Sequence, residues 1–199
     1  YHFGLYLLRK KDRPALYFGL FCFLIAIRTI ATGEILIMSM FPNLDWQVLI
    51  KIEYLSYYLS VPVFVKFIYH LYAVGTSSKI SDGIKTASLV FGSVVIFTPV
   101  KYFTKTLIWY DLITVFACIY ISMILIKAIK DKQEGANYFV FGVFIFLGTV
   151  INDIFFAQGL LPTCEMVSIG LFIFIFFQAL ALSTKSSRAY ANLEKVSTA

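Results

Sequence analysis

Six long apolar runs dominate this sequence. Each is bounded by charged or turn-forming residues, and the helices expected from them cover residues 14–37, 48–74, 84–100, 107–128, 137–157 and 165–184. About 20 apolar residues are needed for a helix to cross a bilayer. Inside lipid every backbone N–H and C=O must be paired within the protein, so runs of this kind form helices. The sequence therefore predicts an all-α, polytopic transmembrane bundle with six complete spans.

The composition excludes a soluble globular domain. Of the 199 residues, 60% are hydrophobic and only 14% are charged, whereas soluble domains are about half apolar and a quarter charged. In water such a chain would expose large apolar patches. Three scattered cysteines without a CxxC pair indicate neither a disulfide framework nor a zinc module. The basic residues lie in short clusters between the apolar runs, so we expect no nucleic-acid partner.

The chain begins with an apolar, aromatic stretch at residues 1–8 that runs directly into a basic cluster at residues 9–13. We interpret it as the end of a first helix whose start is missing, which makes seven helices in the full protein. Residues 1–184 then form the transmembrane domain. Residues 185–199 are helix-friendly and carry a short heptad-like pattern, so we expect a cytoplasmic helical linker that leads towards a missing output domain.

The distribution of lysine and arginine predicts the orientation. Loops on the outer side hold only two lysines, Lys101 and Lys105, with Lys51 at a helix end. The other side holds twelve basic residues, namely Arg9, Lys10, Lys11, Arg13, Lys79, Lys85, Lys127, Lys130, Lys132, Lys185, Arg188 and Lys195. Basic loops remain in the cytoplasm. We therefore expect a multi-pass protein of a bacterial cytoplasmic membrane with a cytoplasmic C-terminus.

Several polar residues fall at membrane depth, where ionisable groups are costly and often functional. From the helical rise of about 1.5 Å per residue, they lie in one layer in the outer half of the bilayer. This predicted polar layer comprises Arg28, Glu53, Asp111, Asn152 and Asp153. In the functional interpretation, Arg28 bridges carboxylates from other helices. In the structural alternative, Glu53 and Asp111 touch headgroups and water while Arg28 and Asp153 form one pair.

Other residues within the spans suggest packing and bending. Pro62 lies inside the run 48–74, where a kink is expected. Gln178, Gly148 and Gly170 are candidates for interhelical packing. Tyrosines and tryptophans near the outer boundary are typical of an interfacial aromatic belt, and they comprise Trp46, Tyr54, Tyr57, Tyr58, Trp109 and Tyr110.

Chemistry-bearing motifs are missing from the sequence. It contains no Gly-rich phosphate loop, no characteristic Ser-His-Asp or Cys-His spacing, and no lysine within the last span that could form a Schiff base. We expect this segment to have no enzymatic activity, no catalytic residues, no metal and no cofactor.

Several stretches are distinctive when taken together: residues 4–13 and 15–21, Ala26 to Arg28, Gly33 and Glu34, residues 53–56, Asn152 and Asp153, residues 159–162, and residues 176–183. In this order along the chain they resemble bacterial seven-transmembrane receptors with diverse intracellular signalling modules. The resemblance implies an extracellular sensing domain before the first helix and a cytoplasmic output enzyme, such as a histidine kinase or a nucleotide cyclase, after the last. Both would belong to the same chain.

The sequence thus favours a receptor domain that relays an extracellular ligand signal through its helices to a cytoplasmic module. Its partners would be the lipid bilayer, the sensing and output domains, and a second copy in a homodimer. Two alternatives stay open. One is a small-solute transporter or channel, which Pro62 and the polar residues at depth would suit. The other is a passive membrane anchor that only dimerises its output domain.

Overall fold

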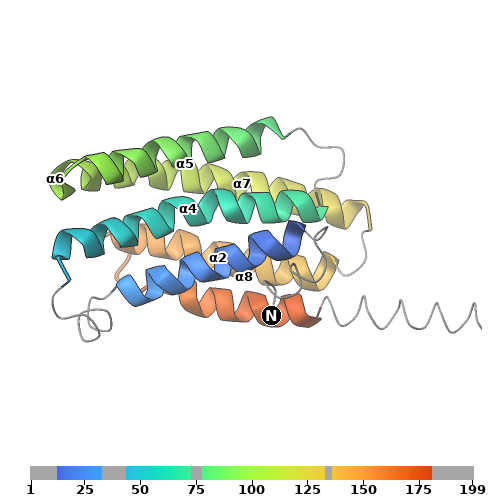
Figure 1. Cartoon of the computed structure of the whole chain (residues 1–199). Coiled ribbons are helices and arrows are strands. Elements are labelled where there is room, and N and C mark those ends of the chain that lie inside the picture. The colour runs from blue at the N-terminus through green and yellow to red at the C-terminus, as the bar shows by residue number, and fades with distance from the viewer. Residues whose placement is uncertain (1–12, 33–43, 73–77, 133–135, 181–199) are drawn as a thin grey trace, which may run out of the picture. The chain divides into compact units, whose positions relative to one another are not determined.

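A computed structural model describes residues 13–32, 44–72, 78–132 and 136–180, and it is all-helical over these ranges, with no strand. The helices in chain order (Figure 1) are α2 (Arg13–Ala31), α4 (Trp46–Tyr72), α5 (Lys79–Phe97), the short α6 (Val100–Phe103), the 3₁₀ turn η1 (Thr104–Thr106), α7 (Leu107–Lys130) and α8 (Ala136–Ala157). One further helix, Val167–Leu180, follows α8 and is called the 167–180 helix here.

Five helical stretches within the described residues are long and apolar enough to cross a membrane. They are Pro14–Ala31, Trp46–Tyr72, Lys79–Phe97, Val100–Lys130 and Ala136–Ala157. The sixth predicted run contains the shorter 167–180 helix. The fold class predicted from the sequence, a polytopic helical bundle, is confirmed. The predicted stub at residues 1–8 and the linker at 185–199 lie outside the described residues.

One boundary difference is at the start of α5, which begins at Lys79 and not at residue 84. Its first turn is polar, and the Asp82 amide already donates to the Ser78 carbonyl over 2.9 Å. The apolar pattern therefore marks only part of the helix. At the other end, Thr98 is extended because the residue before a proline, here Pro99, avoids helical dihedrals. Helix α5 consequently ends at Phe97.

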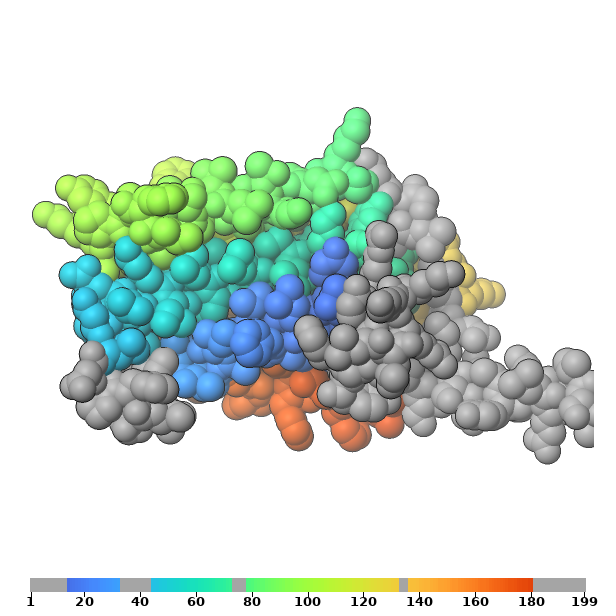
Figure 2. All heavy atoms as spheres, viewed as in Figure 1, coloured from blue at the N-terminus to red at the C-terminus, as the bar shows by residue number. Residues whose placement is uncertain are grey.

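The chain divides into two compact units that meet within α7, between Ile121 and Ser122. In the first unit, α4 lies between α2 and α5 (Figure 1), and the side chains of these three helices form successive bands of the surface in Figure 2. Ring pairs join α2 to α4, with centroids 4.6 Å apart for Phe21 and Phe64 and 5.1 Å apart for Phe18 and Phe67. These aromatic contacts place α2 firmly along α4.

In the second unit, α8 and the 167–180 helix approach closely at small residues. A Cβ atom at Gly142 would lie 2.7 Å from the Cβ of Phe177, and a Cβ at Gly170 would overlap the side chain of Thr149. Between these two points, the Phe174 ring packs at 5.4 Å from Phe139 and 6.0 Å from Phe146. The missing side chains of the glycines allow the backbones to come this close.

The outward faces of the helices are apolar. Phe97, Phe172 and Trp109 expose 84%, 75% and 64% of their side chains, and Leu89 and Val90 on α5 are more than half exposed. In water such a surface would aggregate, whereas in a bilayer it faces lipid.

The close approach in the second unit predicts different effects for two glycines of one helix. Gly142→Ala should lower the free energy of unfolding by about 1–3 kcal/mol, because the added methyl group forces α8 away from the rigid base of Phe177. Gly148→Ala should be neutral or slightly stabilising, since its Cβ would meet no heavy atom within 4 Å among the described residues. Titration with denaturing detergent in micelles measures both, and equal stabilities would contradict the packing described.

Candidate functional site

A chain of polar contacts joins three helices of the first unit. The guanidinium carbon of Arg28, in the last turn of α2, lies 4.8 Å from the centre of the Tyr57 ring on α4. The Tyr57 hydroxyl donates to Asp111 Oδ1 on α7 over 2.9 Å and lies 2.9 Å from Thr114 Oγ1. These four residues are called the polar network below. It links α2, α4 and α7 through side chains alone.

Two of the four residues in the polar network are buried. Asp111 is 5% exposed and Thr114 is 2% exposed, whereas Arg28 and Tyr57 are half-buried. A buried carboxyl group is costly unless it is hydrogen-bonded or close to a cation. The Tyr57 hydroxyl supplies the hydrogen bond, and the cation of Arg28 lies over the face of the Tyr57 ring. The contacts thus form one electrostatically connected group.

Glu53 belongs to the same region of α4 and is half-buried. Together with Asp111 and Arg28, it lies within electrostatic range of the Tyr54 phenol. The structure therefore brings three residues of the predicted polar layer, Arg28, Glu53 and Asp111, into one neighbourhood. The sequence analysis placed Tyr57, which joins two of them, in the interfacial belt and not in the polar layer.

Asn152 and Asp153, the other two residues of the predicted layer, lie near the end of α8 in the second unit. Asp153 accepts the backbone amides of Met166 and Val167, over 2.7 and 2.9 Å, where the 167–180 helix begins. Asn152 donates to the Cys164 carbonyl over 2.9 Å. A carboxylate in this position satisfies free amides and complements the helix dipole. Within its own unit, Asp153 therefore holds the start of the 167–180 helix.

Two tyrosines expected in an interfacial belt are instead fully buried. Tyr58 and Tyr110 are each 0% exposed, and their ring centroids are 4.0 Å apart. With Val95 and Phe103 they form a core where α4, α5, α6 and α7 meet. Trp46 and Trp109 do lie on the surface, with 49% and 64% exposure. The sequence alone does not separate these cases, since a buried and a lipid-facing tyrosine leave the same signal in an apolar run.

Pro62 lies inside α4 and is buried. A proline lacks the N–H that would bind the carbonyl four residues earlier, which here belongs to Tyr58. The Tyr110 hydroxyl donates to that carbonyl over 2.6 Å and lies 2.8 Å from Ser88 Oγ on α5. One phenol thus connects α7, α4 and α5 at the proline.

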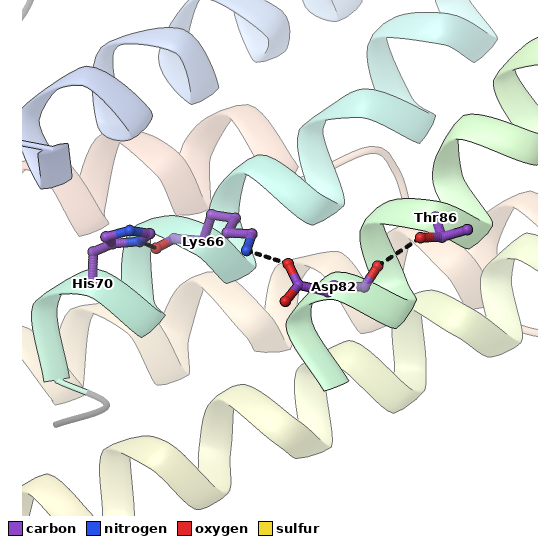
Figure 3. Close-up of polar contacts among 4 residues, drawn as sticks. All are labelled: Lys66, His70, Asp82 and Thr86. Carbon is purple, nitrogen blue, oxygen red and sulfur yellow. Dashed lines mark hydrogen bonds and ion pairs between the residues drawn. The ribbon is translucent and has the colours of Figure 1, made fainter. Parts of the chain in front are cut away.

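An ion pair joins the C-terminal part of α4 to the first turn of α5 (Figure 3). Lys66 Nζ lies 2.6 Å from Asp82 Oδ1, and their side chains are 17% and 54% exposed. The Lys66 carbonyl is 2.8 Å from His70 Nδ1, and Thr86 donates to the Asp82 carbonyl over 2.9 Å. Since Asp82 is largely exposed, water screens the attraction and the pair itself contributes little to stability.

The remaining candidates for packing differ in their surroundings. Gly170 lies against Thr149, whereas Gly148 faces no heavy atom within 4 Å among the described residues. The Gln178 Oε1 atom is buried and has no hydrogen-bond partner in the part of the chain that the structure describes. Over the same residues, no group of three or more His, Cys, Asp and Glu side chains could hold a metal ion.

The polar network predicts a specific cost for one hydroxyl. Tyr57→Phe keeps the ring under Arg28 but removes the donor to buried Asp111, so it should lower the free energy of unfolding by about 1–2 kcal/mol. Tyr102→Phe is the matched control, because Tyr102 is 62% exposed, and it should change little. Detergent titration in micelles compares the two variants, and an unaffected Tyr57→Phe protein would show that the network contributes nothing to stability.

Comparison with known proteins identifies the chain at the level of its family. No curated protein and no solved structure matches the sequence. A model of the family described as 7TM diverse intracellular signalling matches residues 1–185. That match covers nearly the whole chain, including every described helix, and agrees with a multi-pass bundle of apolar helices. The chain therefore belongs to the 7TM diverse intracellular signalling family.

Proposed function

We propose that this chain is the membrane-spanning, signal-transducing domain of a bacterial receptor. It relays the state of an extracellular sensing domain to a cytoplasmic output module of the same chain, such as a histidine kinase or a nucleotide cyclase. Family membership supports the signalling role. The observation that carries the relay mechanism is the polar network, which connects α2, α4 and α7 through Arg28, Tyr57 and Asp111.

A relay needs contacts that differ between two states, because a signal shifts an equilibrium only by its differential interaction with them. The polar network suits this role. A guanidinium over a ring and a phenol shared between a carboxyl and a hydroxyl can exchange partners when helices shift, whereas close-packed apolar contacts resist small displacements. In this proposal the first helices transmit the outer signal to α4 and α7 through the network.

The output end of the relay is the 167–180 helix. Asp153 holds its first amides, and Gly142 and Gly170 let it pack closely on α8. A shift of α8 therefore moves the start of this helix with it. With the C-terminus in the cytoplasm, as the distribution of basic residues favours, the displacement reaches the module that follows.

The basal activity of the output enzyme in the full-length protein tests the relay without knowledge of the ligand. Arg28→Ala and Asp153→Asn should each change the basal rate about fivefold or more, because coupling free energies of about 1–3 kcal/mol correspond to factors of that size. Autophosphorylation or cyclic-nucleotide synthesis in membrane vesicles is the measurement. Lys101→Ala, an exposed cation in α6, and Asp131→Asn, an exposed carboxylate after α7, are controls that should leave the rate unchanged.

Unchanged output in both test variants would refute the relay. A second experiment distinguishes the relay from a passive anchor. Cysteines placed at Thr149 and Gly170 form a disulfide that locks the 167–180 helix to α8. Unaltered output in that locked protein would favour a passive anchor. Release of carboxyfluorescein or K⁺ from proteoliposomes that contain this chain would instead favour a channel.

A further inference from the structure

The main-chain hydrogen bonds of α4 are interrupted in the middle of the helix. Pro62 has no N–H, so the Tyr58 carbonyl loses its helical donor, and the ring of a proline also pushes that carbonyl aside. Ser60 adds to the local disturbance by donating to the Tyr57 carbonyl over 2.8 Å, a bond that often bends helices. Residues 57–62 are therefore the weakest part of α4.

In an apolar environment an unpaired carbonyl is costly, and neighbouring helices usually supply the missing donor. Here the donor is the Tyr110 hydroxyl of α7, at 2.6 Å from the Tyr58 carbonyl oxygen. Tyr110 is 0% exposed, so water does not compete for this bond. The phenol oxygen also lies 2.8 Å from Ser88 Oγ on α5, and the Ser88 hydroxyl donates to the Ile84 carbonyl over 2.9 Å.

Polar contacts hold both arms of α4, and on the upper arm Lys51 donates to the Ile96 carbonyl of α5 over 3.0 Å. Above the break, Tyr57 bonds to Asp111 on α7. Below it, Lys66 pairs with Asp82 on α5 (Figure 3). The lower tie is the weaker one, because it is partly exposed and involves a flexible lysine. The arm at residues 63–72 also packs on α2 through Phe64 and Phe67, so the contact at the break sets its direction relative to α7 and α5.

We propose that Tyr110 is the positioning residue of a hinge in α4. Its hydroxyl replaces the hydrogen bond that Pro62 removes and thereby sets the angle between residues 46–58 and residues 63–72. Loss of this bond lets the lower arm, together with α2 packed against it, change its angle at the break. The role of the hinge in the relay rests on the function proposed above. In that role, a shift of α7 that removes the phenol from the Tyr58 carbonyl would change the direction of the cytoplasmic end of α4.

A double-mutant cycle on this chain in micelles tests the proposal. Tyr110→Phe should raise the unfolding equilibrium constant about tenfold, since it strands a buried carbonyl. In the Pro62→Ala background the same change should cost less than about threefold, because the restored N–H satisfies Tyr58 and only the Ser88 contact is lost. A purely structural role for Tyr110 would give equal costs in both backgrounds and would overturn the hinge.

The chain offers a matched control on the same helix. Tyr120 is 3% exposed, and its hydroxyl has no hydrogen-bond partner among the described residues. Tyr120→Phe should therefore be neutral in both backgrounds. If it were coupled to Pro62 as strongly as Tyr110→Phe, the coupling would not come from the bond to Tyr58.

A distance measurement decides the matter even if Pro62→Ala fails to fold. Spin labels at Val48→Cys and Leu71→Cys lie on the two arms, about 35 Å apart from the helical rise, in a background that lacks the native cysteines Cys22, Cys118 and Cys164. Tyr110→Phe should broaden the distribution of distances measured by pulsed electron paramagnetic resonance in nanodiscs. An unchanged distribution would overturn the hinge. Neither measurement uses the output enzyme, so the hinge and the relay can fail independently.

Discussion

The need to pair every polar group inside an apolar medium determines much of this structure. Lipid offers no hydrogen bonds, so backbone groups must be satisfied within helices and any exception must be repaired by a neighbour. Pro62 is such an exception, and the Tyr110 hydroxyl repairs it at the Tyr58 carbonyl. The repair draws α7 and α5 to one point on α4. A single missing N–H thus influences how three helices are joined.

The same constraint explains where the charged residues lie. Asp111 is buried beside the Tyr57 phenol, whose ring contacts Arg28, and Asp153 is occupied by two main-chain amides. Each charged side chain therefore connects one segment to another. These polar contacts are directional, whereas apolar packing is not. In the function proposed above, contacts of this kind would exchange partners when helices shift.

Much of the fold was predictable, because apolar runs of spanning length have few possible structures in lipid. The helices at 107–130 and 136–157 agree with the predicted spans to within two residues. The start of α5 was not predictable from hydropathy, since its first turn carries Ser81 and Asp82. The candidate site was predictable only in part. Arg28, Glu53 and Asp111 stand out as charges in apolar runs, whereas Tyr57, Tyr110 and Ser88 do not.

By itself, the sequence determined the fold class, the approximate limits of the long apolar helices, and the charged residues that must find partners within them. These follow from local properties: hydropathy, length and the cost of a charge in lipid. Only the tertiary structure decided which partners they find. Whether Tyr58 and Tyr110 face lipid or each other depends on the rotation of each helix about its axis. That rotation arises from packing between segments some fifty residues apart, so it cannot be predicted from either segment alone.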